Sequence, residues 1–183
     1  MRSLDGAARR ALCGLVAMLG ALLAPALAAQ PADVEYAVKA TYLYKFAPFV
    51  EWPAGTFTNP TDPFVICVAG DDPVGELVGE AVRGQSVGRH PIAAVHLVAG
   101  EAPRCNILYV AGHGAAAAAV LARVRGLPVL TVTDDAGSAH AIVNFVVQDH
   151  RVRFEIDLSA AAANHLSISS KLLNLALRVV PTP

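Results

Sequence analysis

The chain has 183 residues, of which 14 are basic, 15 are acidic and 55% are hydrophobic, and its formal net charge is −1. The basic residues are scattered, without the run or stripe that contacts nucleic-acid phosphates, so the composition argues against a nucleic-acid-binding protein. The length suits one domain with a full hydrophobic core and is short for two.

Residues 1–28 have the pattern of a secretory signal peptide. Three arginines precede an uncharged apolar run over residues 11–23, and Ala26-Leu27-Ala28 forms a small-x-small cleavage site. A membrane anchor needs about 20 apolar residues, and this run is shorter and is followed by Pro25. We therefore expect export with cleavage at or beside residue 28, and a single mature domain, residues 29–183, that does not insert into a membrane.

Residues 34–47 predict the first helix of the mature chain, because no Gly or Pro interrupts them and Asp33 can cap their start. Glu35 and Lys39 stand four residues apart, in the order that favours an ion pair. Two largely apolar faces are expected, one with Tyr36, Ala40, Leu43 and Ala47, the other with Val34, Val38, Thr41, Tyr42 and Phe46. A helix of this kind is usually covered on more than one side, either within the subunit or by another protein.

Further aromatic residues follow this helix. Phe49 and Trp52 come next, and Pro53 prevents a helix there. If the first face of the helix packs on a sheet, Tyr42 and Phe46 point elsewhere and form an aromatic patch with Phe49 and Trp52. Because aromatic residues are frequent interface anchors, we predict that this patch contributes to a homodimer or binds a protein partner. The alternative is that a C-terminal amphipathic helix covers it.

Strands and helices alternate through the middle of the chain. The expected elements are strands at 64–69, 92–98, 105–110 and 128–133, a helix capped by Asp72 that buries Val74, Leu77, Val78 and Ala81, and an alanine-rich helix from 114 to 125. This alternation indicates parallel strands with right-handed crossovers. Residues 141–148 and 151–158 then predict a hairpin, and 166–180 an amphipathic helix. The predicted fold is a single α/β domain with a mostly parallel sheet, helices on both faces and an antiparallel hairpin at the C-terminal edge.

Removal of the leader with Cys13 leaves two cysteines, Cys67 and Cys105. They lie in the first and third predicted strands, which are commonly neighbours in a doubly wound sheet. An oxidising compartment favours a disulfide, and two buried free thiols are the alternative.

In folds of this kind, binding sites lie at the carboxyl ends of the parallel strands. They carry Gly70-Asp71-Asp72, Gly112-His113-Gly114 and Thr133-Asp134-Asp135. Two aspartate pairs and a histidine could bind a cation or a polar solute, but aspartates in such places more often cap helices and turns. No phosphate loop, zinc motif or nucleophile motif is found in the sequence, so we expect no catalytic residues, metal or cofactor.

Seven segments of the mature chain, in order, carry a family resemblance: residues 37–46, 49–53, 66–72, 105–108, 129–132, 152–156 and 166–173. Together they resemble the YfiR-like family of periplasmic regulatory proteins. The resemblance implies a non-enzymatic repressor that binds the periplasmic domain of an inner-membrane diguanylate cyclase or sensor kinase and controls cyclic-di-GMP signalling and biofilm formation. It also implies a disulfide between Cys67 and Cys105, which match the family's paired cysteines.

The other class to consider is a periplasmic solute- or cation-binding protein that uses the acidic edge of the sheet. Size argues against this class, because a binding protein of two closing domains needs a longer chain.

Overall fold

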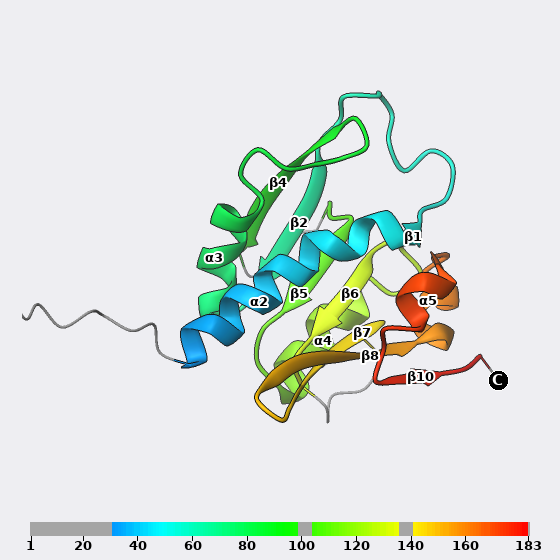
Figure 1. Ribbon diagram of the computed structural model, residues 1–183. Coiled ribbons are helices and arrows are strands. Elements are labelled where there is room, and N and C mark those ends of the chain that lie inside the picture. Colours follow the sequence, from blue (N-terminus) through cyan, green and yellow to red (C-terminus); the bar gives the residue numbers. More distant parts are fainter. Residues whose placement is uncertain (1–30, 99–103, 136–140, 183) are drawn as a thin grey trace, which may run out of the picture. The chain divides into compact units, whose positions relative to one another are not determined.

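The computed structural model describes residues 31–98, 104–135 and 141–182, so the predicted signal peptide lies outside the described residues. The helices are α2 (Pro31–Phe46), the short 3-10 turn η1 (Ala47–Phe49), α3 (Pro73–Ala81), α4 (Gly114–Arg123), α5 (Leu158–Ala163) and α6 (Ser170–Leu173) (Figure 1). Among them, none has both the length and the apolar character that crossing a membrane requires.

One large sheet organises the domain. Its strands are β2 (Phe64–Ala69), β3 (Ser86–Val87), β4 (His90–Leu97), β5 (Ile107–Val110), β6 (Leu130–Thr133), β7 (Val143–Gln148), β8 (Arg151–Asp157) and β10 (Arg178–Val180). They are arranged in the order β10-β8-β7-β6-β5-β2-β4-β3. The strands from β4 to β7 are parallel, and β7 and β8 form the antiparallel hairpin. The predicted α/β fold is confirmed.

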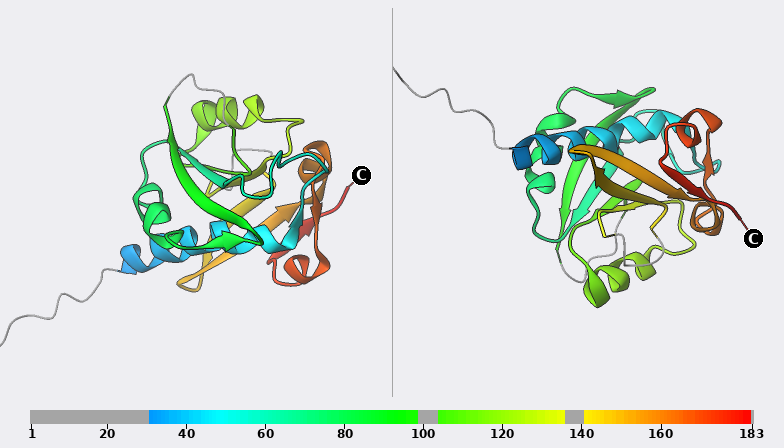
Figure 2. Two further views of the ribbon diagram at one scale, coloured as in Figure 1. Left: turned by 90° about the horizontal axis from the view of Figure 1, so that it is seen from above. Right: turned by 60° about the horizontal axis from the view of Figure 1, so that its bottom comes forward.

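Helices cover the two faces of the sheet, with α2 and α3 on one face and α4 on the other (Figure 2). Strand β2 supplies both cores, because successive residues of a strand point to opposite faces. Ile66 and Val68 pack with the α2 and α3 side, whereas Cys67 and Ala69 pack with the α4 side. Burial on both faces explains why β2 reads as an uninterrupted apolar run.

The two helix caps expected near the start of the fold have different outcomes. Asp72 caps α3 as predicted: its carboxylate accepts a hydrogen bond of 2.7 Å from the amide of Val74, and Pro73 takes the first helical position. The prediction that Asp33 caps the first helix is wrong. Helix α2 already begins at Pro31, so Asp33 lies in its first turn, where a carboxylate still favours the positive end of the helix dipole.

Cys67 and Cys105 form a disulfide, with 5.7 Å between their Cα atoms. The bond is feasible because β2 and β5 are neighbours, as expected. Asn106, next to Cys105, also bonds to β2. Its amide donates to the carbonyl of Val65, and its side-chain Oδ1 accepts from the amide of Val65, both at 2.8 Å.

The predicted C-terminal helix over residues 166–180 is wrong. The segment instead contains β9 (Ser167–Ile168), which pairs with β1 (Val50–Glu51), then the single turn of α6, and then β10, which runs parallel to β8 outside the hairpin. The free side of β8 offers backbone partners that a helix would leave unused, and the amide of Leu177 donates to the carbonyl of Phe154 at 2.8 Å. Two β-branched residues, Val179 and Val180, also suit a strand.

Candidate functional site

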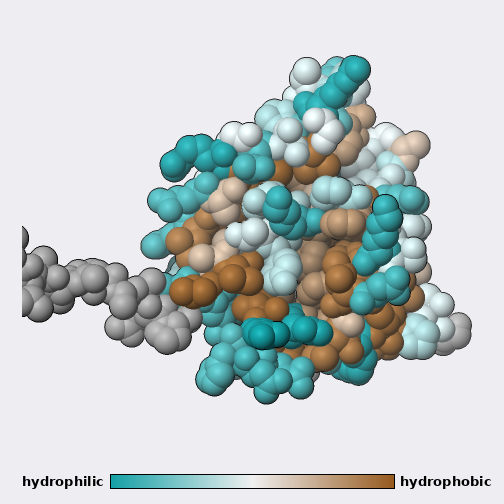
Figure 3. All heavy atoms as spheres, in the orientation of Figure 1, coloured by the Kyte–Doolittle hydropathy of each residue, from teal (hydrophilic) through white to brown (hydrophobic). Residues whose placement is uncertain are grey.

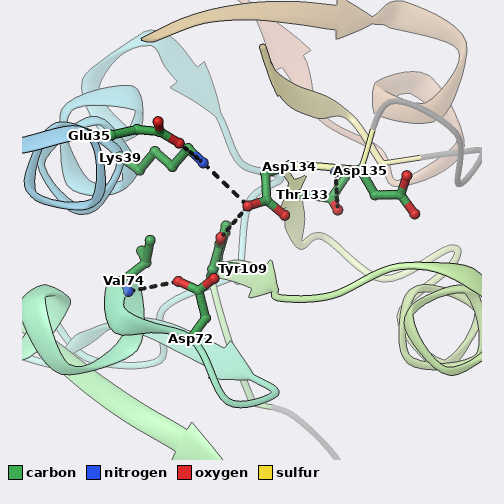
Figure 4. A network of polar contacts seen from close by, with 8 residues as sticks. All are labelled: Glu35, Lys39, Asp72, Val74, Tyr109, Thr133, Asp134 and Asp135. Atoms are coloured by element: carbon green, nitrogen blue, oxygen red, sulfur yellow. Dashed lines mark hydrogen bonds and ion pairs between the residues drawn. The ribbon is translucent and has the colours of Figure 1, made fainter. Parts of the chain in front are cut away.

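The acidic edge of the sheet holds a polar network that includes a lysine from α2 (Figure 4). The ammonium of Lys39 lies 2.7 Å from a carboxylate oxygen of Glu35 and 3.3 Å from one of Asp134, which follows β6. The hydroxyl of Tyr109, from β5, donates to the same oxygen of Asp134 at 3.2 Å. The network therefore ties α2 to the carboxyl ends of two neighbouring strands.

Burial and charge together set the ionisation of this network. Burial alone would lower the pKa of Lys39, but its hydrogen bond to Glu35 and the charges of Asp134 and Glu35 outweigh that effect and raise the pKa. The pKa of Tyr109 is raised by burial first, and then by the charges of Asp134 and Asp72, so its hydroxyl stays a neutral donor. Burial also raises the pKa of Asp72, against the effect of its hydrogen bond from Val74.

These contacts favour a structural role for the candidate acidic residues. Lys39 supplies the positive charge that a bound cation would bring to Asp134, and Asp135 accepts a 3.3 Å hydrogen bond from the amide of Gly114 at the start of α4. Asp71 and His113 are exposed. Within the described ranges, no group of three or more His, Cys, Asp or Glu residues is arranged to hold a metal ion. The sequence predicted the pair of Lys39 with Glu35, but the contact of Lys39 with Asp134 could not be foreseen without the fold.

The four aromatic residues predicted to bind a partner do not form one patch. Tyr42 and Phe46 stack on each other and pack against Phe145 and Phe154 of the β7–β8 hairpin, with ring centroids 5.1 to 6.1 Å apart. Phe46 is only 1% exposed, so the expectation that it points outward is wrong. The hairpin covers it, in place of the C-terminal helix considered as the alternative.

Trp52 and Phe49 belong to a different part of the domain. The indole of Trp52 packs edge-to-face on Phe64 of β2, at 5.2 Å between centroids. The carbonyl of Phe49 accepts a hydrogen bond from the amide of Ser169. Tyr42, Phe49 and Trp52 are all half-buried, so part of each side chain is still accessible to a partner.

A groove of about 540 Å³ lies between the N-terminal half of α2 and the β7–β8 hairpin. Its lining comprises Ala32, Val34, Glu35, Val38 and Tyr42 from the helix and Val147, His150, Arg151, Val152 and Arg153 from the hairpin. Val34 is 53% exposed and Val147 is 50% exposed. Figure 3 shows hydrophobic residues at the surface beside hydrophilic ones in this part of the molecule.

The charge at the rim of this groove is mainly positive. Arg151 and Arg153 are both exposed, and neither has an ion-pair partner in the part of the chain that the structure describes. Exposed apolar side chains with a polar rim are typical of surfaces that bind another protein. The sequence indicated an apolar outer face on the helix, but not that the hairpin lies beside it.

A profile of the YfiR/HmsC-like family matches residues 36–177. The chain belongs to this family. No curated protein matches the chain. The matched region contains the disulfide, the polar network at the sheet edge and most of the groove. The family consists of regulatory proteins and not of catalysts, and membership is consistent with a periplasmic regulator of cyclic-di-GMP signalling.

Proposed function

We propose that this protein is a periplasmic repressor that binds the periplasmic domain of an inner-membrane diguanylate cyclase or sensor protein, and so controls cyclic-di-GMP signalling and biofilm formation. The family match over residues 36–177 is the observation that carries this proposal. The disulfide agrees with it, since structural disulfides persist in oxidising compartments such as the periplasm. On this proposal the chain is not an enzyme, and it acts by binding to a surface of its partner protein.

The groove between α2 and the hairpin is the surface we assign to the partner. Val34, Val38 and Val147 can take up an apolar side chain from the partner. Arg151 and Arg153 stand beside them and can pair with its carboxylates. Tyr42 lines the same groove, while Phe49 and Trp52 offer further contacts elsewhere on the surface.

The repressor function is tested by deleting the gene and measuring cyclic-di-GMP and biofilm mass. Loss of a repressor releases its cyclase, so both should rise, and the gene expressed in trans should restore them. Unchanged cyclic-di-GMP in the deletion strain would contradict the repressor function and favour the solute-binding alternative.

The groove is tested by complementing the deletion strain with the variant Val38→Asp. A carboxylate there places charge in an apolar surface and removes a contact, so repression should be lost while the protein remains folded. Ala37→Asp is the matched control, because Ala37 is exposed on the same helix and does not line the groove. Equal repression by the two variants would place the partner elsewhere.

A further inference from the structure

Strand β4 lies near one end of the sheet, and a neighbouring strand pairs along most of its length on one edge only. Along its length it pairs with β2, from Phe64 opposite Ile92 to Ala69 opposite Leu97. On its other side, β3 pairs only with His90 and Pro91, and the amide of Ile92 donates to the carbonyl of Gln85 at 3.0 Å. Beyond Ile92, no strand among the described residues pairs with that side.

The free backbone groups of β4 follow from the alternation of a strand. Since the amide of Ile92 points away from β2, the amides and carbonyls of Ala94 and His96 point the same way, and those of Ala93 and Val95 point towards β2. Ala94 and His96 therefore present two donors and two acceptors in a row at an open edge.

The side chains along this edge do nothing to prevent pairing. Residues 92–98 carry no Lys, Arg, Asp, Glu or Pro, which are the residues that usually protect an edge strand. Ala94, Val95 and His96 are exposed, Val95 by 42%, and Val98 just beyond the strand is 68% exposed. An uncharged, apolar edge of this length is a template for another strand.

We propose that a second copy of this chain pairs its β4 antiparallel to this edge, which joins the two sheets into one across a two-fold axis. Such an interface is isologous, so the same segment must complement itself. The absence of charge over residues 92–98 allows this, because two copies bring no like charges together.

The free groups of the strand also favour one register. Outward-pointing residues of the two copies must face each other, and the amide of Ile92 is already bonded to the carbonyl of Gln85. Pairing Ala94 of one copy with His96 of the other is therefore the register that uses the free amides and carbonyls of both residues. The two symmetric pairs then exchange about four backbone hydrogen bonds. Val95 falls on the axis in a non-hydrogen-bonded pair, where side chains approach closely, so its exposed surface is buried against its counterpart.

The first experiment measures the oligomeric state of the mature, disulfide-bonded protein by sedimentation equilibrium over a range of concentrations. We expect a monomer–dimer equilibrium for the wild type. Ala94→Pro removes an amide that is unpaired in the monomer and should weaken dimerisation roughly tenfold or more. Ala94→Val keeps the amide and is the control. A wild type that stays monomeric, or a dimer that Ala94→Pro leaves intact, would overturn the proposal.

The second experiment tests the register. Val95→Lys and Val95→Glu each place like charges on the axis, so each variant alone should be monomeric, whereas a mixture of the two should form a heterodimer. Failure of the mixture to associate while the single variants are monomeric would refute the register with Val95 on the axis.

Hydrogen exchange read by NMR gives an independent measure of the edge. The amides of Ala94 and His96 should be protected at high concentration and exchange quickly on dilution, whereas the amide of Val95 should be protected at both. If the wild type is monomeric and binds the cyclase domain, and the Ala94→Pro variant does not bind it, the strand that pairs here belongs to the partner and not to a second copy.

Discussion

The two ends of the sheet differ in how they are protected. At one end, β10 is three residues long, Pro181 follows it directly, and Arg178 forms a two-point ion pair with Glu155 of β8, with N–O distances of 3.0 and 2.6 Å. At the other end, β4 is eight residues long and uncharged from Pro91 onward, and β3 covers only its first residues. Short length, proline and charge are the usual means of keeping a strand edge from pairing.

The difference indicates that the two ends have different roles. A short edge with charge and proline resists pairing, whereas a long uncharged edge is a template for another strand. On our proposal, self-association takes place at the β4 end, and the groove between α2 and the hairpin, nearer the β10 end, is left for a different partner.

The largest effect on stability is expected from the disulfide, which anchors the strand on which the β4 edge depends. The double variant Cys67→Ala, Cys105→Ala should lower the free energy of unfolding by about 4 kcal/mol, because the bond closes a long loop in the unfolded chain. Urea unfolding of the oxidised wild type and the variant measures this. Equal stability would contradict a stabilising effect of the bond through loop closure in the unfolded chain.

The next largest effect is expected at Lys39, which acts at the centre of the sheet and at neither end. Lys39→Met removes the cation between Glu35 and Asp134 and leaves their carboxylates without a counter-charge, which should cost about 3 kcal/mol. Lys45→Met, at an exposed position of the same helix, is the control. The dimer should persist at concentrations at which the variant is folded, and its loss would mean that α2 also shapes the β4 edge.

A smaller effect is expected at Asp72, which caps α3 beside β4. Asp72→Ala should cost about 1 kcal/mol through loss of the cap, whereas Asp72→Asn keeps a capping oxygen and should be close to neutral. Thermal unfolding of the two variants compares them directly. Equal losses would mean that the charge of Asp72, and not its cap, stabilises this end of the sheet.

The contribution of Asp72 to stability should also depend on pH, in a direction that its pKa determines. Burial raises the pKa of native Asp72 above its ordinary value of 3.8, so the native state takes up this proton before the unfolded state does. The contribution of Asp72 to stability therefore rises as the pH falls from neutral through the raised pKa towards 3.8. The wild type should gain stability relative to Asp72→Asn over that range, and a relative loss would contradict the raised pKa.

Much of this architecture could be predicted from local sequence, and two wrong predictions, for Phe46 and for residues 178–180, have a common cause. The buried strand Phe64–Ala69 and the Asp72 cap depend on neighbours in the chain, so the sequence was sufficient. Local sequence predicts Phe46 at the surface because the β7–β8 hairpin that covers it comes about 100 residues later in the chain. Local sequence predicts a helix at Arg178–Val180, which forms a strand because tertiary structure brings it beside β8.

The smallest change in stability, and the most direct test of the difference between the two ends, is expected from removing the protection of β10. Arg178 is 63% exposed in its side chain, and exposed ion pairs contribute little to stability, so Arg178→Val with Pro181→Val should leave the unfolding temperature almost unchanged. The same change gives β10 an uncharged edge that can continue as a strand. A dimer joined through β4 would then have an open edge at each outer end, and open edges at both ends allow growth into chains of molecules. Light scattering should therefore show particles larger than a dimer for this variant, and adding Ala94→Pro should reduce them to pairs joined through β10. Particles no larger than the wild type would show that proline and charge are not what keeps the β10 end single.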